Sequence, residues 1–192
     1  MKNKSNITEL QDYRKPMKNP ILTELLDHWE RLRAGRIAPL RSEIDPRQIE
    51  NALQHAFILE RPENGEARFR IAGMKLSELM GMEVRAMPAN AIIVPEMRSE
   101  FSTVLHNLFE CPEIVELTLE APVPNGGKIS ADMLLLPMKN DEGEISRILG
   151  CLVASGVAPF PPHRFLIKSR RVTRIVASDY THVRAKVSGF SE

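Results

Sequence analysis

Three alternating segments joined by two tight turns fill residues 113–156, and they constrain the fold more than any other feature of the chain. In the first segment Val115, Leu117 and Leu119 alternate with polar residues, as in a strand with one buried and one solvated face. The turn sequences "PNGG" and "KNDEG" separate it from "KISADMLLLPM" and "EISRILGCLVASG". Connections this short make neighbouring strands antiparallel. The pattern therefore predicts a three-stranded antiparallel meander.

Two shorter strands and two helices are expected before the meander. The stretches "HAFILE" and "ARFRIAG" flank a loop rich in turn residues, and in the second stretch Phe69 and Ile71 alternate with arginines. Apolar residues at helical spacing indicate a short helix at 74–82 and a longer one at 95–110. Strand pairs with helices clustered between them predict an α+β domain with an antiparallel sheet.

Length and composition divide the chain into four parts. Its 192 residues, 43% of them hydrophobic, suit one domain of ordinary size with extensions. We expect a flexible N-terminal arm at 1–19, a flanking helix at 20–35, the domain itself at 36–156 and a basic C-terminal extension at 157–192. Two cysteines without a C-x-x-C motif fit a reducing cytoplasm, and no apolar run approaches the roughly 18 residues that span a bilayer. The expected location is the cytoplasm, without a membrane partner.

Charge is balanced overall but not along the chain. A formal net charge of +1 argues against a protein that coats nucleic acid or an anionic membrane as a whole. Near the C-terminal end, however, seven lysines and arginines from Arg164 to Lys186 stand against Asp179 alone. Weak alternation around Val172 and Ile175 allows one additional strand there. Because no nucleic-acid-binding module accompanies this charge, we favour a solvated basic face or tail over phosphate contacts.

Three stretches carry a family resemblance. The sequences "SEIDPRQIENALQHAFILE", "FRIAGMKLSELMGMEVR" and "LLLPM…GEISRILGCLV" resemble the stand-alone PAS domain proteins found mainly in alphaproteobacteria. The similarity runs roughly from Arg36 to Gly156, and it implies a PAS fold with a five-stranded antiparallel sheet, helices on one face and a role in sensing or signalling. It implies no particular ligand. Ala86 departs from the glycine that the family often carries after "EVR".

The resemblance directs attention to the concave face of the sheet, which in a PAS fold encloses an apolar cavity together with the short helices. The alternation assigns to this cavity the candidate ligand-contacting residues Phe57, Leu59, Phe69, Ile71, Met74, Leu76, Leu79, Met80, Phe101, Leu105, Leu117, Leu119, Met133 and Leu135. Unbranched thioethers such as those of Met74, Met80 and Met82 adapt to a small apolar guest. The same side chains also suit a filled core, and we favour that interpretation.

The opposite face of the sheet is predicted to be apolar as well. If Met133 and Leu135 face inward, the leucines that alternate with them face outward, and a sheet with two apolar faces must be covered on both. The flanking helix carries an apolar stripe and is the obvious cover. Candidate interface residues are Leu22, Leu25, Leu26, Trp29, Leu32, Leu134, Leu136, Leu149 and Val153. Packing within the chain and packing across a homodimer both remain open.

No cofactor, metal or catalytic group is predicted. Haem-binding PAS domains use a histidine on the helix before the third strand; His106 lies on that helix but away from its apolar stripe, so we expect it in solvent. Flavin photochemistry needs a cysteine in an N-C-R-type motif, which is missing, and Cys111 and Cys151 are interpreted as structural thiols. Asp132 and Glu116 are expected to face water rather than form an acid–base pair. No metal-ligand spacing or hydrolase motif occurs.

The leading prediction is a non-enzymatic PAS sensor or adaptor in cytoplasmic signal transduction. It would act through contacts with a protein partner, with an unidentified small apolar ligand as an option. Two alternatives stay open: a pure protein-interaction module with a filled core and, less favoured, a haem-binding sensor.

Overall fold

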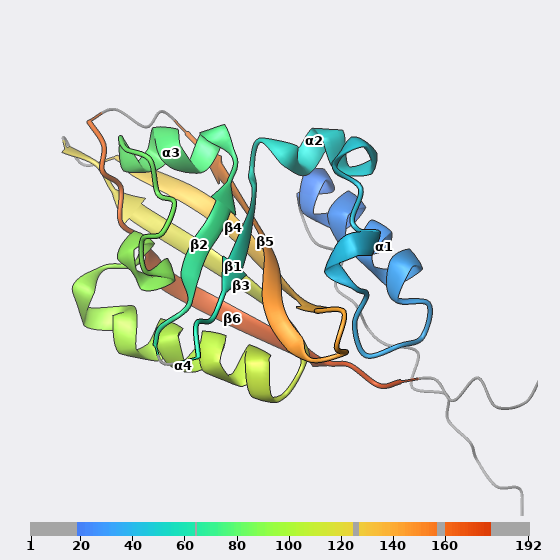
Figure 1. The fold of residues 1–192 in the computed structure, drawn as a ribbon. Helices are drawn as coiled ribbons and strands as arrows, with labels where there is room; N and C mark the ends of the chain where they lie inside the picture. The colour runs from blue at the N-terminus through green and yellow to red at the C-terminus, as the bar shows by residue number, and fades with distance from the viewer. Residues whose placement is uncertain (1–18, 64, 125–126, 157–159, 178–192) are drawn as a thin grey trace, which may run out of the picture.

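The computed structural model describes residues 19–63, 65–124, 127–156 and 160–177, whose arrangement is shown in Figure 1. The α-helices are α1 (Pro20–Arg33), α2 (Glu50–Leu53), α3 (Met74–Met80) and α4 (Arg98–Glu110). The 3₁₀ helices are η1 (Arg41–Glu43), η2 (Pro46–Ile49), η3 (Ala89–Ile92) and η4 (Pro95–Met97). The strands are β1 (Ala56–Glu60), β2 (Arg68–Ala72), β3 (Glu113–Pro122), β4 (Lys128–Lys139), β5 (Ile145–Ser155) and β6 (Leu166–Arg174). The arm expected at 1–19 lies, except for its last residue, outside the described residues.

All strands pair antiparallel in a single sheet of order β2-β1-β5-β4-β3-β6. The α+β class and the meander of β3, β4 and β5 are confirmed. The expected count of five strands is wrong, because β6 adds a sixth beside β3. This strand lies within the predicted C-terminal extension, where weak alternation allowed an additional strand, and it pairs with β3 from Glu113, opposite Arg174, to Glu120, opposite Leu166.

The segment that leads into β6 packs against the domain and does not extend away from it. The backbone N–H of His163 donates to the carbonyl of Leu79 at the end of α3, at 2.9 Å. The N–H of Phe165 donates to the carbonyl of Ile92 in η3, also at 2.9 Å, and its ring is fully buried. Residues 163–174 therefore belong to the folded domain and not to a tail, although only His163 and Phe165 among them are buried.

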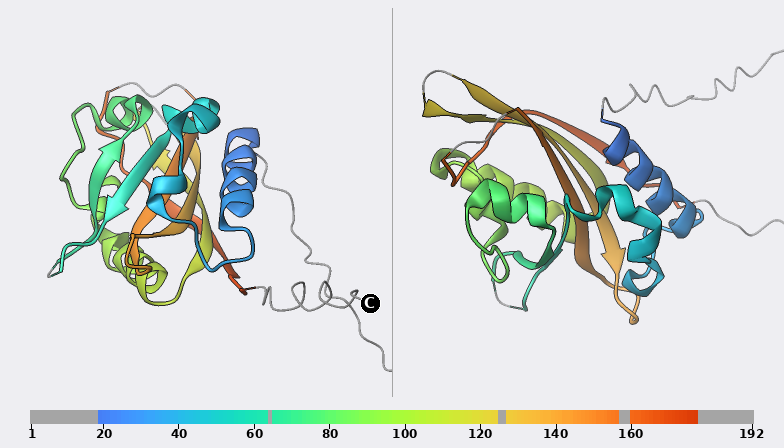
Figure 2. Two further views of the ribbon diagram at one scale, coloured as in Figure 1. Left: turned by 45° about the vertical axis from the view of Figure 1, so that its right-hand side comes forward. Right: turned by 90° about the horizontal axis from the view of Figure 1, so that it is seen from above.

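Helices cover both faces of the sheet (Figure 2). The inner face carries α3, α4 and the short 3₁₀ helices between them, and the outer face carries α1 and α2. The flanking helix forms as predicted: the Asn19 side chain caps it by accepting from the N–H of Ile21 at 3.0 Å, and Pro20 occupies its first turn. It ends at Arg33, where Ala34 adopts a left-handed conformation one residue before the expected stop at Gly35.

Candidate functional site

The predicted pocket residues are brought together on the inner face with two exceptions. Twelve of the fourteen are buried in one hydrophobic cluster between the sheet, α3 and α4: Phe57, Leu59, Phe69, Leu76, Leu79, Met80, Phe101, Leu105, Leu117, Leu119, Met133 and Leu135. The alternation of β3 and β4 therefore assigned the inner face correctly. Whether these residues contact a ligand stays a prediction.

The two exceptions, Ile71 and Met74, are 51% and 61% exposed, so their assignment to the cavity is wrong. The cause for Ile71 is a register shift between β1 and β2, in which Leu59 lies opposite Phe69 whereas Ile58 lies opposite Ile71. The extra residue, Arg70, inverts the alternation, so that Ile71 points to the outer side with Ile58. Met74 opens α3 on its solvent side, and Met82, just beyond the helix, is also half-exposed.

Aromatic rings fill the centre of the inner face. The ring of Phe57 lies directly over Gly150 of the neighbouring strand, so closely that a Cβ at Gly150 would stand 2.0 Å from a ring carbon. The same ring packs edge-on against Phe69, with centroids 5.4 Å apart. Phe101 from α4 and Phe165 from the segment before β6 are buried in the same cluster. A core of mutually packed side chains therefore occupies the position at which the sequence allows a ligand cavity.

Two small cavities lie at the rim of this core rather than at its centre. One of about 170 Å³ lies between α4 and the β1–β2 connection, with Arg61, Glu66, Asn90, Ser102 and His106 among its lining residues. The Asn90 amide is held in place there by Glu66, at 3.2 Å, and by Ser102, at 3.1 Å. Ala67, Leu105 and Phe109 complete the lining, so the wall of the cavity is more apolar than polar, and Leu105 is one of the predicted pocket residues.

The second cavity, of about 280 Å³, lies where α3 meets the ends of β1 and β5. Its lining includes His55, Lys75, Glu78 and Leu79. Lys75 and Glu78 form an ion pair at 2.9 Å. Burial lowers the pKa of His55, with Lys75 adding to this shift. Only Leu79 of the predicted pocket residues lines this cavity, because the strand alternation marks the centre of the sheet and not its ends.

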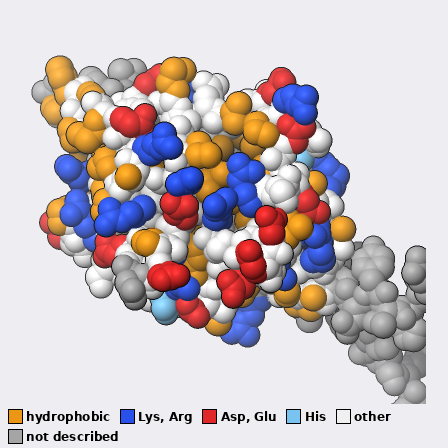
Figure 3. All heavy atoms as spheres, in the orientation of Figure 1, with side chains coloured by type: hydrophobic (Ala, Val, Ile, Leu, Met, Phe, Trp, Pro, Cys, Tyr) orange, Lys and Arg blue, Asp and Glu red, His pale blue; other side chains and the backbone are white. Residues whose placement is uncertain are grey.

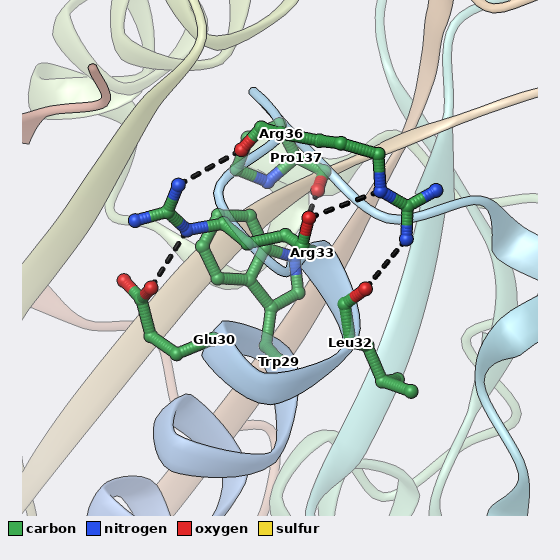
Figure 4. A network of polar contacts seen from close by, with 6 residues as sticks. All are labelled: Trp29, Glu30, Leu32, Arg33, Arg36 and Pro137. Carbon is green, nitrogen blue, oxygen red and sulfur yellow. Dashed lines mark hydrogen bonds and ion pairs between the residues drawn. The ribbon is translucent and has the colours of Figure 1, made fainter. Parts of the chain in front are cut away.

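The outer face is covered by α1 of the same chain. Leu22, Leu25, Leu26 and Trp29 pack on it with the outward-facing residues of β4 and β5. The indole Nε1–H of Trp29 donates to the carbonyl of Pro137 at 2.9 Å, a contact between residues 108 positions apart (Figure 4). This carbonyl is available because the pairing of β3 with β4 ends at Leu135, before the proline is reached.

The end of α1 is held by a second set of contacts (Figure 4). The Arg33 guanidinium lies over the indole of Trp29, 5.6 Å from the ring centroid, and pairs with Glu30 at 2.7 Å. Arg36 donates to the carbonyls of Leu32 and Arg33, at 2.5 Å and 3.0 Å. The helix is therefore anchored both on the sheet and at its C-terminal end.

This packing bears on the predicted interface residues. Leu22, Leu25, Leu26, Trp29, Leu134, Leu136 and Leu149 are all buried within one chain, and Leu32 and Val153 are partly buried. The cover on the outer face is thus intramolecular, as one of the two open alternatives has it. A second copy of the chain could contact the seven buried side chains only after α1 had left the sheet.

The residues weighed for chemistry are dispersed. His106 is exposed, as predicted, and Cys111 is exposed while Cys151 is buried on the outer face. Asp132 lies opposite Thr118, whereas Glu116 forms an ion pair with Arg171, so the two carboxylates do not face each other. Among the described residues, no three His, Cys, Asp or Glu side chains are grouped as a metal site would require.

Sequence analysis missed two buried histidines. His28 and His163 are 2% and 3% exposed, and the Nε2 atom of each has no hydrogen-bond partner within the described part of the chain. His28 lies three residues after Leu25 on the buried stripe of α1, a spacing that could have revealed it. His163 lies in an irregular segment, where no periodic pattern of apolar residues predicts burial.

The surface in view in Figure 3 shows exposed apolar atoms interspersed with charges of both signs. Leu53 and Ile71 contribute exposed apolar surface, at 46% and 51% exposure. Within the described residues, none of the helices combines the length and apolar character that crossing a bilayer requires.

Comparison with protein families assigns the fold. A family model described as a PAS domain matches residues 17–153. The chain belongs to the PAS domain family. A search of curated proteins finds no match. The narrower resemblance to stand-alone alphaproteobacterial proteins stays a prediction.

Solved structures with similar folds include light-oxygen-voltage domains. One, studied with a flavin analogue, is 15% identical with a TM-score of 0.44, and the match covers 57% of this chain and 83% of that one. The LOV protein of Rhodobacter sphaeroides is 10% identical with a TM-score of 0.42, covering 60% and 71%. VqmA from Vibrio cholera, solved with ligand and DNA, is 17% identical with a TM-score of 0.43, covering 58% and 51%.

Proposed function

We propose that this PAS domain is a non-catalytic adaptor in cytoplasmic signal transduction that acts through contacts with another protein. The observation that carries the proposal is the closed inner face, where the rings of Phe57, Phe69, Phe101 and Phe165 occupy the space over the sheet. A domain whose core is filled by its own side chains has its outer surface left for transmitting a signal. Among the described residues, no three His, Cys, Asp or Glu side chains are grouped so that they could hold a metal ion.

Family membership and the resemblance to stand-alone PAS proteins both support a signalling role. No cofactor enters the proposal: His106 lies in solvent, where it would leave a haem iron without a buried ligand. Cys151 is deep in the outer core, far from the inner face that a flavin would occupy in this fold.

A ligand sensor is the second candidate, because the two rim cavities combine apolar walls with charged side chains. Its ligand would be small and would carry a polar group beside its apolar part, unlike the purely apolar guest expected from the sequence. In the cavity at the end of α3, Lys75 and Glu78 would supply one group of each sign.

Native mass spectrometry of the full-length protein, before and after denaturation, separates the two candidates. The adaptor predicts the mass of the polypeptide alone in both spectra. A mass excess that disappears on denaturation would overturn the filled-core proposal and favour a sensor. In that event Lys75→Glu should abolish the excess, whereas Arg85→Glu, at an exposed position away from both cavities, should retain it. The same spectra report the oligomeric state, which the buried candidate interface leaves undecided.

In-cell cross-linking with mass spectrometry tests the adaptor directly. The proposal predicts a reproducible cross-link from an exposed lysine of the folded domain to a signalling protein. No cross-link above the level given by a denatured control would contradict it.

A further inference from the structure

The helices do not cover the outer face of the sheet evenly. Helix α1 packs over β4 and β5, and α2 lies beside the start of β1 (Figure 2). Beyond these helices, Ile71 of β2 is 51% exposed, and the side chain of Glu60 at the end of β1 is 36% exposed. The corner of the outer face formed by β2 and the end of β1 is therefore accessible to solvent.

Two exposed apolar side chains lie close together at one end of this corner. Leu53 is the last residue of α2 and is 46% exposed. The backbone of Gly73 approaches it so closely that a Cβ at Gly73 would stand 2.6 Å from the Leu53 carbonyl oxygen. Ile71 lies two residues before Gly73 and points to the outer side with Ile58, its partner on β1. Leu53 and Ile71 therefore form a small apolar patch.

Three arginines surround one glutamate at the other end of the corner. Arg68 and Arg147 lie opposite Glu60 on its two neighbouring strands, and the Arg70 guanidinium lies 3.6 Å from the Glu60 carboxylate. Arg68 donates to the uncharged carbonyl of Ala86 at 3.0 Å. Within the part of the chain that the structure describes, neither Arg68 nor Arg147 has a carboxylate at ion-pair distance. One glutamate thus faces three positive charges.

We call the surface formed by Leu53, Ile71, Arg68, Arg70 and Arg147 the arginine corner. Figure 3 views the molecule from this side and shows basic side chains gathered around exposed apolar atoms over β1 and β2. An apolar patch bordered by uncompensated positive charge is complementary to a group that is apolar at one end and acidic at the other.

The spacing within the arginine corner indicates the form of this partner. Ile71 and Arg68 are three residues apart on β2, which is about 10 Å along a strand. Seven residues of an α-helix span about the same distance. A helix that carries acidic residues and, seven positions further along the same face, leucines therefore matches both ends of the corner.

An added strand does not fit this corner, because the edge of β2 is already paired. The N–H of Ala86 donates to the carbonyl of Phe69 at 2.8 Å, and the N–H of Phe69 donates to the carbonyl of Met87 at 3.0 Å. The segment at 84–89 therefore occupies the edge, and a partner reaches the face of the strand instead.

Two other occupants match the corner less well. In a second copy of this chain, α1 and α4 are the longest helices of the described part, and both bury their apolar residues in their own domain. An anionic membrane would place phosphates against Glu60 at the centre of the arginines, whereas a helix can place an uncharged residue there.

We propose that the arginine corner binds an acidic amphipathic helix of a partner protein. The proposal rests on the adaptor function above and names the surface and the chemistry of the partner. Acidic side chains of the helix contact Arg68, Arg70 and Arg147, and its leucines cover Leu53 and Ile71.

The test uses the full-length protein and a fluorescein-labelled synthetic peptide of sequence SAEQAEEAQLQALLAQ. As a helix, this peptide places its three glutamates and its three leucines on one face, with seven positions between the two groups, and the serine and the early glutamates favour helix formation. Fluorescence anisotropy should show saturable binding that weakens as salt is added, since exposed charges are screened.

Variants of the protein locate the binding surface. Arg68→Glu/Arg70→Glu should lose at least about tenfold in affinity, because two attractive charge contacts become repulsive. The matched control is Arg170→Glu/Arg174→Glu, which makes the same change of net charge on the exposed strand β6 at the other edge of the sheet, and its affinity should stay close to that of the wild type. Ile71→Asp should also weaken binding, because it places a negative charge in the apolar patch.

Variants of the peptide separate helix docking from general charge attraction. The peptide SAKQAKKAQLQALLAQ should bind Arg68→Glu/Arg70→Glu and not the wild type, which also shows that this variant is folded. The peptide SAEQAEEPQLQALLAQ keeps every charge and leucine but breaks the helix at its centre, so it should not bind. Hydrogen exchange at 68–72 should slow when the first peptide is added.

Equal binding by the proline peptide would overturn helix docking, and equal losses in the two double variants would overturn the assignment to this corner. Absence of peptide binding would overturn the proposal, and sedimentation of the protein with phosphatidylserine vesicles in that case would assign the corner to a membrane surface. Each of these results leaves the adaptor function standing if in-cell cross-links to a signalling protein persist. A mass excess in the native spectrum would instead remove the adaptor function itself.

Discussion

Gly150→Ala provides the sharpest test of the filled inner face. Gly150 lies opposite Phe57 in the β1–β5 pair, and a Cβ at this position would stand 2.0 Å from Cε2 and 2.2 Å from Cζ of the ring. Ordinary contact begins at 3.4 Å, so the ring would have to retreat by about 1.4 Å. Phe57 is buried and packed against Phe69, so its ring cannot move by this distance without displacing neighbouring side chains.

The expected cost follows from two opposing effects. Overpacking a rigid core costs up to about 3 kcal/mol, and alanine in a strand recovers roughly 0.5–1 kcal/mol relative to glycine. We therefore expect the free energy of unfolding to fall by about 2 kcal/mol, which for a chain of this size lowers the Tm by roughly 4–8 °C. Urea unfolding followed by far-UV circular dichroism measures the change.

A double-mutant cycle identifies the ring as the cause. In a Phe57→Leu background the clash is relieved, so the cost of Gly150→Ala should shrink by at least about 1 kcal/mol. Gly143→Ala is the matched control: no atom lies within 4 Å of its added Cβ, and its cost comes from a φ of +86° alone. That cost should be the same with Phe57 or Leu at position 57. Additive losses for Gly150→Ala and Phe57→Leu would refute the argument that the inner face is full.

Three other predictions concern the outer face and α1. Trp29→Phe removes the donor to the buried Pro137 carbonyl, so the free energy of unfolding should fall by about 1–3 kcal/mol, and an unchanged urea midpoint would contradict this. Burial raises the pKa of the Cys151 thiol to about 12, so a thiol reagent at pH 8 should modify Cys111 alone in the native protein and both cysteines in denaturant; two fast native thiols would be inconsistent with the packing. Burial lowers the pKa of His28 below its ordinary value of 6.5, so below pH 6.5 the unfolded chain binds a proton that the folded chain does not. The Tm should therefore decline as the pH falls below 6.5, and His28→Gln should reduce that decline; an unchanged pH dependence in the variant would count against it.

Strand alternation in the sequence predicted the two faces of β3, β4 and β5 because those strands keep a period of two over most of their length. Leu134 and Leu136 are outside and Met133 and Leu135 are inside, as expected. The same rule failed at Ile71, where one extra residue in β2 reverses the faces. Such a bulge depends on how two strands align, and the sequence of one strand does not contain that information.

The pairing of β6 with β3 could have been found from charge. Glu113, Glu116 and Glu120 on β3 lie opposite or close to Arg174, Arg171 and Lys168 on β6, an antiparallel match in reverse order along the chain. Weak alternation around Val172 and Ile175 allowed an additional strand here but did not indicate its partner, because an edge strand buries little on either face. Cross-strand charge pairs were the usable signal.

Coverage of the sheet decides where a partner can act. The inner face is filled by aromatic rings, the outer face lies largely under α1, and the β2 edge is paired with the segment at 84–89. Strand β3 links the two cores, since Val115 packs in the inner cluster and Ile114 in the outer one. A partner that restrains β3 would therefore affect the packing of α4 and α1 together.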